Sequence, residues 1–241
     1  MHTSNGKGHI KSGLYSLLLM LMANLISVKS WAVTGSDISL IDLMIDSYEL
    51  KMFAWADQHA YSKDGPGIDA RPQEVRMYQS LLHLDEYEGK LEASLEELSQ
   101  SLQNFSVNWQ EQKKPTSHFA KELESTQQAF KAFLRSKMSN SPNVSIRAEQ
   151  IDKLLTLSSI YVFMASDAST SFSITEKYNT EVLISSLDSS LSEYPVRDSN
   201  LLPKWRFLKS AFLREDYVAP LLVKRHALSM ALILERSLDD A

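Results

Sequence analysis

Charged and polar side chains interrupt two apolar helical stripes, and these side chains are the strongest candidates for chemistry. Glu88 falls inside a leucine-rich stripe, and Arg225, Ser229 and Arg236 fall among the apolar residues of the last segment. An unpaired charge taken into a core costs several kcal/mol, so such a charge is paired, bound to a ligand or exposed. We expect Glu88 and Arg225 to form an ion pair inside the protein. Arg236 and Ser229 would then hold a carboxylate or another anion.

Two interpretations of these charges that involve no ligand stay open. The ion pair could be purely structural, and the arginine stems could reach the solvent at the end of the helix. Two tryptophans raise a similar choice, because Trp55 ends one apolar stripe and Trp205 begins a later helical segment. They could line a ligand cleft at one end of the protein, or they could simply pack in the core.

The motifs of familiar enzymes are absent from the sequence. Beyond residue 32 the histidines are His59, His83, His118 and His226; no glutamate stands three residues before any of them and no two are four apart. There is also no Gly-x-Ser-x-Gly and no phosphate-binding glycine loop. We therefore predict no enzyme activity, no catalytic residue, no metal and no cofactor. Met52 and His226 as ligands of a b-type haem stay an open alternative, although a methionine on an apolar stripe is usually a core residue.

The first 32 residues have the composition of an export signal. Two lysines precede an apolar run from Leu14 to about Val28, and no acidic residue occurs before Asp37. The run is shorter than the ~20 residues that a spanning helix needs. Ser30 and Ala32 supply the small residues of a cleavage site, so we predict a signal peptide over 1–32, with an uncleaved N-terminal anchor as the alternative.

The composition of the chain limits the cellular compartments and the classes of partner that are expected. The chain has no cysteine, which excludes disulfides, thiolate metal sites and a lipid-modified cysteine. Loss of the leader would remove three lysines and lower the net charge from −5 to about −8. An acidic chain without a basic run argues against nucleic acid and against membrane insertion after cleavage. We expect a bacterial periplasmic or secreted protein.

Glycine and proline mark the gaps between helices. Only four glycines lie beyond the leader, and the prolines fall between apolar-periodic segments or at their starts. The segments 38–55, 81–105 and 119–133 repeat apolar residues every three or four positions, which is the helical period. A fourth segment, starting near an N-cap at Ser145, runs to Pro195 as one helix or as two separated around 166–178. Pro203 and Pro220 open the last pair.

This pattern predicts an all-α protein, an antiparallel bundle of about five to seven helices forming a single domain over 33–241. Two sets of apolar residues are expected to face the core. From the first two segments the set is Ile41, Ile45, Tyr48, Met52, Leu84, Leu91, Leu95, Leu98 and Leu102. In the last segment one face is expected to consist of Val218, Leu221, Leu222, Leu228, Leu232 and Ile233.

The stretch "LPKWRFLKSAFLREDYVAPLLVKRHALSMALILERSL" places Trp205 two residues after Pro203 and lets Pro220 open a final helix with a basic pair. In these features it resembles the periplasmic helical sensor domains of type IV pilus chemotaxis-type receptors and nitrate-sensing kinases. The resemblance implies a free-standing exported relative of these bundles. The ligand-binding arginine motif of the nitrate-sensing members is not recognisable, so no ligand follows from it.

The sequence thus favours a periplasmic, non-enzymatic helical bundle that binds a small anionic ligand or a partner protein of the envelope. A structural or assembly factor of the envelope, working through a helix face, is the first alternative. An enzyme without a recognisable motif is the second.

Overall fold

The computed structural model describes most of the chain beyond the predicted leader, and the predicted signal peptide lies outside the described residues. At Glu88 only the backbone is described. The described ranges are 33–57, 59–67, 69–82, 84, 88–113, 116–166, 179–214 and 217–238.

The described residues form eight helices and one small hairpin, which confirms the all-α prediction. The helices are α2 (Gly35–Ala56), α3 (Arg71–Leu81), α4 (Glu88–Gln112), α5 (Ser117–Lys137), α6 (Pro142–Met164), α7 (Thr180–Glu193), α8 (Leu201–Phe212) and α9 (Pro220–Arg236). The hairpin pairs β1 (Tyr61–Ser62) with β2 (Gly65–Pro66).

Local sequence explains where the central helices begin. Thr34 and Asp37 form a capping box: the Asp37 amide donates to Thr34 Oγ1 at 3.2 Å, and the Thr34 amide donates to Asp37 Oδ2 at 3.0 Å. The second carboxylate oxygen of Asp37 accepts the Ser139 amide at 2.7 Å, which ties the α5–α6 connection to the start of α2. Pro142 and Pro220 occupy the first turns of α6 and α9, where a missing amide hydrogen costs nothing.

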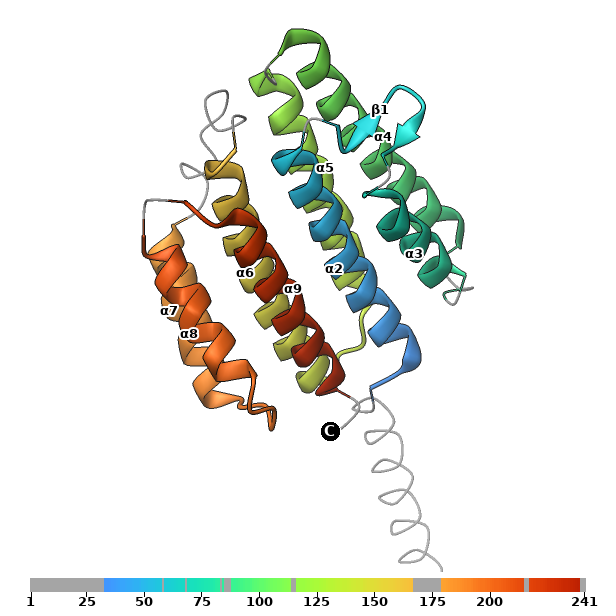
Figure 1. Cartoon of the computed structure of the whole chain (residues 1–241). Helices are drawn as coiled ribbons and strands as arrows, with labels where there is room; N and C mark the ends of the chain where they lie inside the picture. The colour runs from blue at the N-terminus through green and yellow to red at the C-terminus, as the bar shows by residue number, and fades with distance from the viewer. Residues whose placement is uncertain are drawn as a thin grey trace, which may run out of the picture.

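The helices lie roughly along one direction, with α2 near the middle of the molecule (Figure 1). On one side α3 and α4 pack against α2, with the hairpin lying on α4, and on the other side α6 and α9 pack against α2. The pair α7 and α8 forms the outer layer beyond α6 and α9. One hydrophobic cluster contains residues of all eight helices. All nine residues of the first predicted core set are buried in it, so that prediction is confirmed.

Two expectations about the elements need correction, and the alternative left open for the fourth segment is resolved. The stretch between the predicted segments 38–55 and 81–105 contains the β1–β2 hairpin and α3, so the described helices number eight, one more than the upper end of the predicted five to seven. Gly67 allows this compact turn, because a Cβ there would stand 2.7 Å from the carbonyl oxygen of His59. The fourth segment is two helices, α6 and α7, and α6 begins at Pro142 after Ser141 rather than at Ser145.

The face of the last helix was predicted the wrong way round. Val218, Leu221 and Leu222 are exposed, Leu232 is 37% exposed, and Leu228 and Ile233 are only partly buried. The apolar residues that α9 buries are Val223, Ala227, Met230, Ala231 and Leu234, and Glu235 is buried beside them. The small alanines of this buried stripe let α9 approach α6 closely. A prediction based on the large apolar residues alone misses a stripe that is partly made of alanine.

Candidate binding sites

A buried ion pair joins α2 to α5. Lys51 Nζ lies 3.1 Å from Glu124 Oε2, and each side chain is only 2% exposed. The ammonium group also lies 4.6 Å from the ring centroid of Trp55 and donates to Gln127 Oε1 at 3.4 Å. Burial lowers the pKa of Lys51, and the charge of Glu124 opposes that shift.

A second set of polar contacts links the same helices to α6. The Tyr48 hydroxyl donates to Asp152 Oδ1 at 2.6 Å and lies 2.7 Å from Thr156 Oγ1. Asp152 also pairs with Lys131 at 2.9 Å and with Arg135 at 3.2 Å. Burial, reinforced by the Asp152 charge, raises the pKa of Tyr48.

Together these contacts form an internal polar network across α2, α5 and α6. A lysine with a lowered pKa is a chemically reactive group in principle. Here its side chain is enclosed, and its contacts with Glu124 and Gln127 join α2 to α5, so the network holds helices together. Sequence reasoning did not find it, although polar Gln127 in the gap between Leu123 and Phe130 of the third stripe was a signal.

The two tryptophans pack separately. Trp55 is completely buried, with its ring edge-on to Phe163 at a centroid distance of 4.9 Å. Trp205 is 3% exposed and donates through Nε1 to Asp188 Oδ1 at 2.6 Å, and Lys209 pairs with the same carboxylate at 2.7 Å. Neither tryptophan lines any of the pockets described here, so the proposed cleft between them is not formed by those pockets.

The structure does not bring together the residues of the predicted polar site. Glu88 is the first residue of α4, and its side chain lies outside the described part of the protein. Arg225 is exposed on α9, so the expectation that it enters the core was wrong: the inverted face of α9 carries it to the surface. Ser229 is half-buried and lines none of the pockets described here, whereas Arg236 lines a pocket at the end of α9.

This arginine pocket, of about 640 Å³, lies where the start of α6, the α7–α8 connection and the end of α9 meet. Its cations are Arg147, Arg197 and Arg236, and its one carboxylate belongs to Asp198. Within the described ranges none of the three arginines makes an ion pair. Sequence reasoning identified Arg236 and missed the other two, which approach it only through the packing of α6 and α7.

The best-positioned cation of the pocket is Arg147. Its Nη1 donates to the carbonyl oxygen of Tyr194 and to Gln150 Oε1, both at 2.8 Å. Gln150 is itself buried and donates to the Ser190 carbonyl oxygen at 3.0 Å, which anchors α6 to α7. Burial lowers the pKa of Arg147, because desolvation disfavours its charged form. A fixed, partly desolvated guanidinium is a strong partner for an oxyanion.

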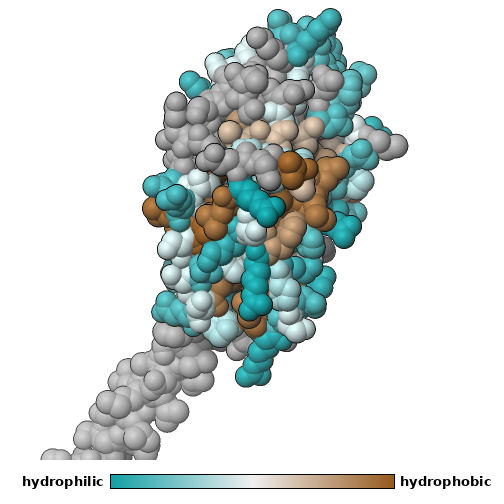
Figure 2. All heavy atoms as spheres, turned by 60° about the vertical axis from the view of Figure 1, so that its left-hand side comes forward, coloured by the Kyte–Doolittle hydropathy of each residue, from teal (hydrophilic) through white to brown (hydrophobic). Residues whose placement is uncertain are grey.

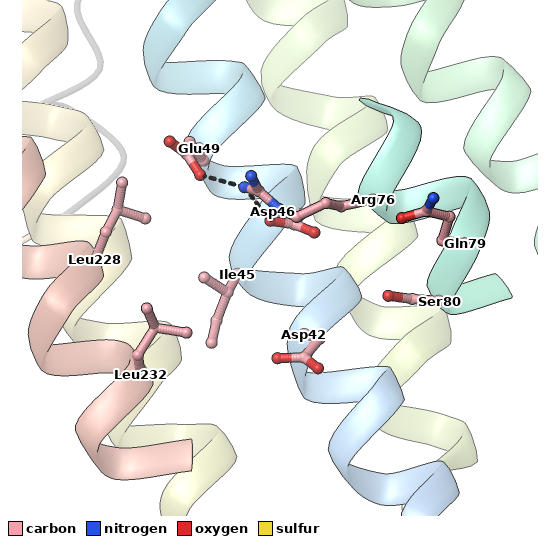
Figure 3. A pocket seen from close by; sticks show the side chains of 9 residues that line it. All are labelled: Asp42, Ile45, Asp46, Glu49, Arg76, Gln79, Ser80, Leu228 and Leu232. Atoms are coloured by element: carbon pink, nitrogen blue, oxygen red, sulfur yellow. Dashed lines mark hydrogen bonds and ion pairs between the residues drawn. The ribbon is translucent and has the colours of Figure 1, made fainter. Parts of the chain in front are cut away.

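A second pocket, of about 660 Å³, opens between α9, α2 and α3 (Figure 3). We call it the acidic groove, because α2 supplies Asp42, Asp46 and Glu49 to it. Leu228 and Leu232 of α9 form the opposite wall, and Ile45 lies between the leucines and the carboxylates. On the third side α3 contributes Arg76, Gln79 and Ser80.

Arg76 compensates only part of the groove's negative charge. Its Nη2 lies 2.9 Å from both Asp46 Oδ1 and Glu49 Oε2, while Asp42 makes no hydrogen bond or ion pair within the described residues. Burial raises the pKa of Asp46 to about 6, with Arg76 acting in the opposite direction. Burial also raises the pKa of Asp42. A cation placed in the groove would lower the pKa of both carboxyls.

Exposed apolar side chains gather on the face made by the last helices, between hydrophilic ones (Figure 2). The most exposed are Val218 at 76% and Leu221 at 70%, with Leu213 of the α8–α9 connection at 59%. On α9, Leu221 stands seven residues before Leu228 and eleven before Leu232, so the three share one side of the helix. This apolar side continues into the acidic groove.

None of the described helices is long and apolar enough to cross a bilayer. Among the same residues no group of three or more His, Asp or Glu side chains is arranged to hold a metal ion. Met52 is buried on α2, whereas His226 of α9 packs on Phe207 of α8, with ring centroids 4.7 Å apart.

Comparison of the chain with known protein families, with curated proteins and with solved structures finds no match. The residues of the two pockets are therefore the candidates for a function of this chain.

Proposed function

We propose that this chain is an exported, non-enzymatic helical-bundle protein that binds a small anion of the carboxylate or phosphate class in the arginine pocket. The observation that carries the proposal is the meeting of Arg147, Arg197 and Arg236 around one pocket with a single carboxylate. Three guanidinium groups and one carboxylate leave an excess of two positive charges, in a protein whose net charge is −5. Local excess charge of sign opposite to the whole molecule favours a specific anion over general electrostatic attraction.

The size of the pocket suits a metabolite. Its 640 Å³ lies within the range of small-molecule sites, roughly 300–1,000 Å³. Ile233 and Val196 add apolar surface beside the charges, so a ligand with a short carbon skeleton and one or two oxyanion groups would fill it better than a bare ion. The likeness of residues 202–238 to periplasmic sensor bundles is consistent with such a role.

Calorimetry with inorganic phosphate and with citrate tests the proposal. We expect saturable binding of at least one of them, and Arg236→Gln should weaken it about tenfold or more, the usual effect of losing a charged hydrogen bond. Arg225→Gln is the matched control, since Arg225 lies on the same helix and lines none of the described pockets. Absence of binding by both anions, or an equal loss in both variants, would contradict the anion site.

Export is tested separately. When the chain is made with its own leader in a bacterium with two membranes, we expect the periplasmic form to begin at Val33. Ala32→Lys should prevent cleavage, because the cleavage site requires small residues. A cytoplasmic protein that retains residues 1–32 would contradict export and leave the anion proposal intact.

A further inference from the structure

We propose that the acidic groove is a docking site for one basic amphipathic helix of a partner protein. The inference is independent of the arginine pocket, which lies at another part of the surface with different residues.

The groove is wide enough to hold one additional α-helix. Helices α3 and α9 each pack on α2 and flank it on either side (Figure 3). Packed helices lie about 8–10 Å apart, so the axes of α3 and α9 are separated by no more than roughly 16–20 Å. A helix with side chains is about 10 Å wide and fits between two such ridges.

Apolar side chains line the groove at helical spacing. Leu228 and Leu232 are one turn apart on α9, and Ile45 of α2 faces them across the groove (Figure 3). Leu221 extends the same side of α9, so the apolar line is about 16 Å long at 1.5 Å per residue. That length is more than a small metabolite covers, and it matches apolar residues on three successive turns of a docked helix.

The charges of the groove specify a basic partner. Asp42, Asp46 and Glu49 present three carboxylates, and Arg76 is the one guanidinium that lines the groove with them. Asp42 and Glu49 are seven residues apart on α2, about 10 Å, which equals two turns of a helix lying alongside. Lysines or arginines seven residues apart on the partner would therefore meet both carboxylates.

Lys224 limits where the basic side chains of the partner can lie. Its Nζ lies 3.2 Å from the ring centroid of Phe53, where it covers the α2 surface beyond Glu49. Burial lowers the pKa of Lys224, and the charge of Glu49 opposes the shift. The positive charge of Lys224 repels a basic side chain of the partner near Phe53. The basic side chains of the partner are therefore expected to lie in the part of the groove between Asp42 and Glu49.

The probe is a synthetic helical peptide of about 18 residues, with leucines along one side and lysines along both flanks. Its matched control has every lysine replaced by glutamate. In fluorescence anisotropy at low salt, we expect the lysine peptide to bind at least about tenfold more tightly than the glutamate peptide. Its affinity should fall as salt rises, because the ion pairs are exposed to solvent.

Variants locate the binding. Leu228→Gln with Leu232→Gln, and separately Asp42→Asn with Glu49→Gln, should each weaken the lysine peptide about tenfold. Leu202→Gln, at a more exposed leucine on α8 that lines none of the described pockets, should leave binding unchanged. Circular dichroism with thermal melting verifies that each variant is folded, since all five residues are at least partly exposed.

Four results would overturn the docking site. The lysine peptide could bind no better than the glutamate peptide, or the groove variants could bind as the unchanged protein does. Alternatively, spermidine at equal charge could displace the peptide completely, which would identify a small-cation site. Self-association that the leucine variants abolish, measured by sedimentation, would assign the groove to a second copy of the chain.

Discussion

At the scale of single residues, the protein places a lysine and a glutamate where solvent does not reach. Lys51 and Glu124 are each 2% exposed and 3.1 Å apart. The desolvation of two charges offsets most of their attraction, so the pair is expected to add little net stability. Removal of one partner has a different consequence, because the other charge is then left uncompensated in the core.

Lys51→Met should therefore lower the free energy of unfolding by about 3–5 kcal/mol. Lys51→Met combined with Glu124→Leu should recover most of that loss, because no unpaired charge remains. Urea unfolding of the two single variants and the double variant measures this coupling. If the losses of the single variants simply add in the double variant, the pair is not coupled as its geometry indicates.

Asp46 is expected to make stability depend on pH. Its pKa is about 6 in the folded protein, against about 3.9 in an unfolded chain. Between these values the folded state holds a proton that the unfolded state has released, so stability falls as pH rises from about 4 to 6. The loss is ~2–3 kcal/mol for this group and is complete above pH 6.

Asp46→Asn cannot titrate and should lack this part of the pH dependence. The measurement is the free energy of unfolding of the variant and of the unchanged protein at several pH values. Asp64→Asn, at an exposed carboxylate of the hairpin turn, is the control and should retain the slope. Parallel curves for Asp46→Asn and the unchanged protein would show that Asp46 is not the residue responsible.

At the scale of elements, packing decides what each helix contributes. Leu95 of α4 is 1% exposed in the common core, and Leu82, just after α3, is 71% exposed. Leu95→Ala should cost about 2–5 kcal/mol through lost burial and a residual cavity. Leu82→Ala should change stability by less than about 0.5 kcal/mol, as for most surface sites. Thermal or urea unfolding compares the two, and a near-zero loss for Leu95→Ala would show that α4 does not pack as described.

Periodicity predicted the elements well where a helix has one apolar side. The stripes of α2 and α4 were found because large apolar residues recur at a single helical period and are all buried. The method was wrong for α9, which has apolar residues on both sides, since Val223 and Met230 face α6 while Leu221 and Leu232 face outward. It missed α3 because that helix buries only Gln73, Met77 and Leu81, too few for a clear period.

At the scale of the whole molecule, the helices should differ in their resistance to local opening. Helix α6 is buried on nearly all sides from Ile151 to Phe163, whereas α7 buries only Ile184, Leu187 and Leu191. Amide hydrogen exchange should therefore be slowest in α6 and much faster in α7 and α8. Equal protection of these helices would indicate that the outer pair unfolds only with the rest.

The candidate sites were less accessible to sequence reasoning than the fold. Arg236 was identified because it breaks an apolar pattern, but Arg147 and Arg197 lie in parts of the chain about 90 and 40 residues earlier, and only the packing brings them together. The acidic groove was missed for a related reason. Its carboxylates alternate with apolar residues on α2 as any surface face does, and its leucines were assigned to the core.

The central position of α6 has a consequence for the order in which the molecule acquires its shape during synthesis. Two of the surfaces that enclose α6 come from α2, about a hundred residues earlier, and from α9, the last helix that the structure describes. A nascent chain that ends before Pro220 must leave one side of α6 uncovered, including the surface that later receives Ala227 and Ala231. Such a chain presents apolar surface to chaperones, and we expect fragments lacking α9 to aggregate where the full chain stays monodisperse.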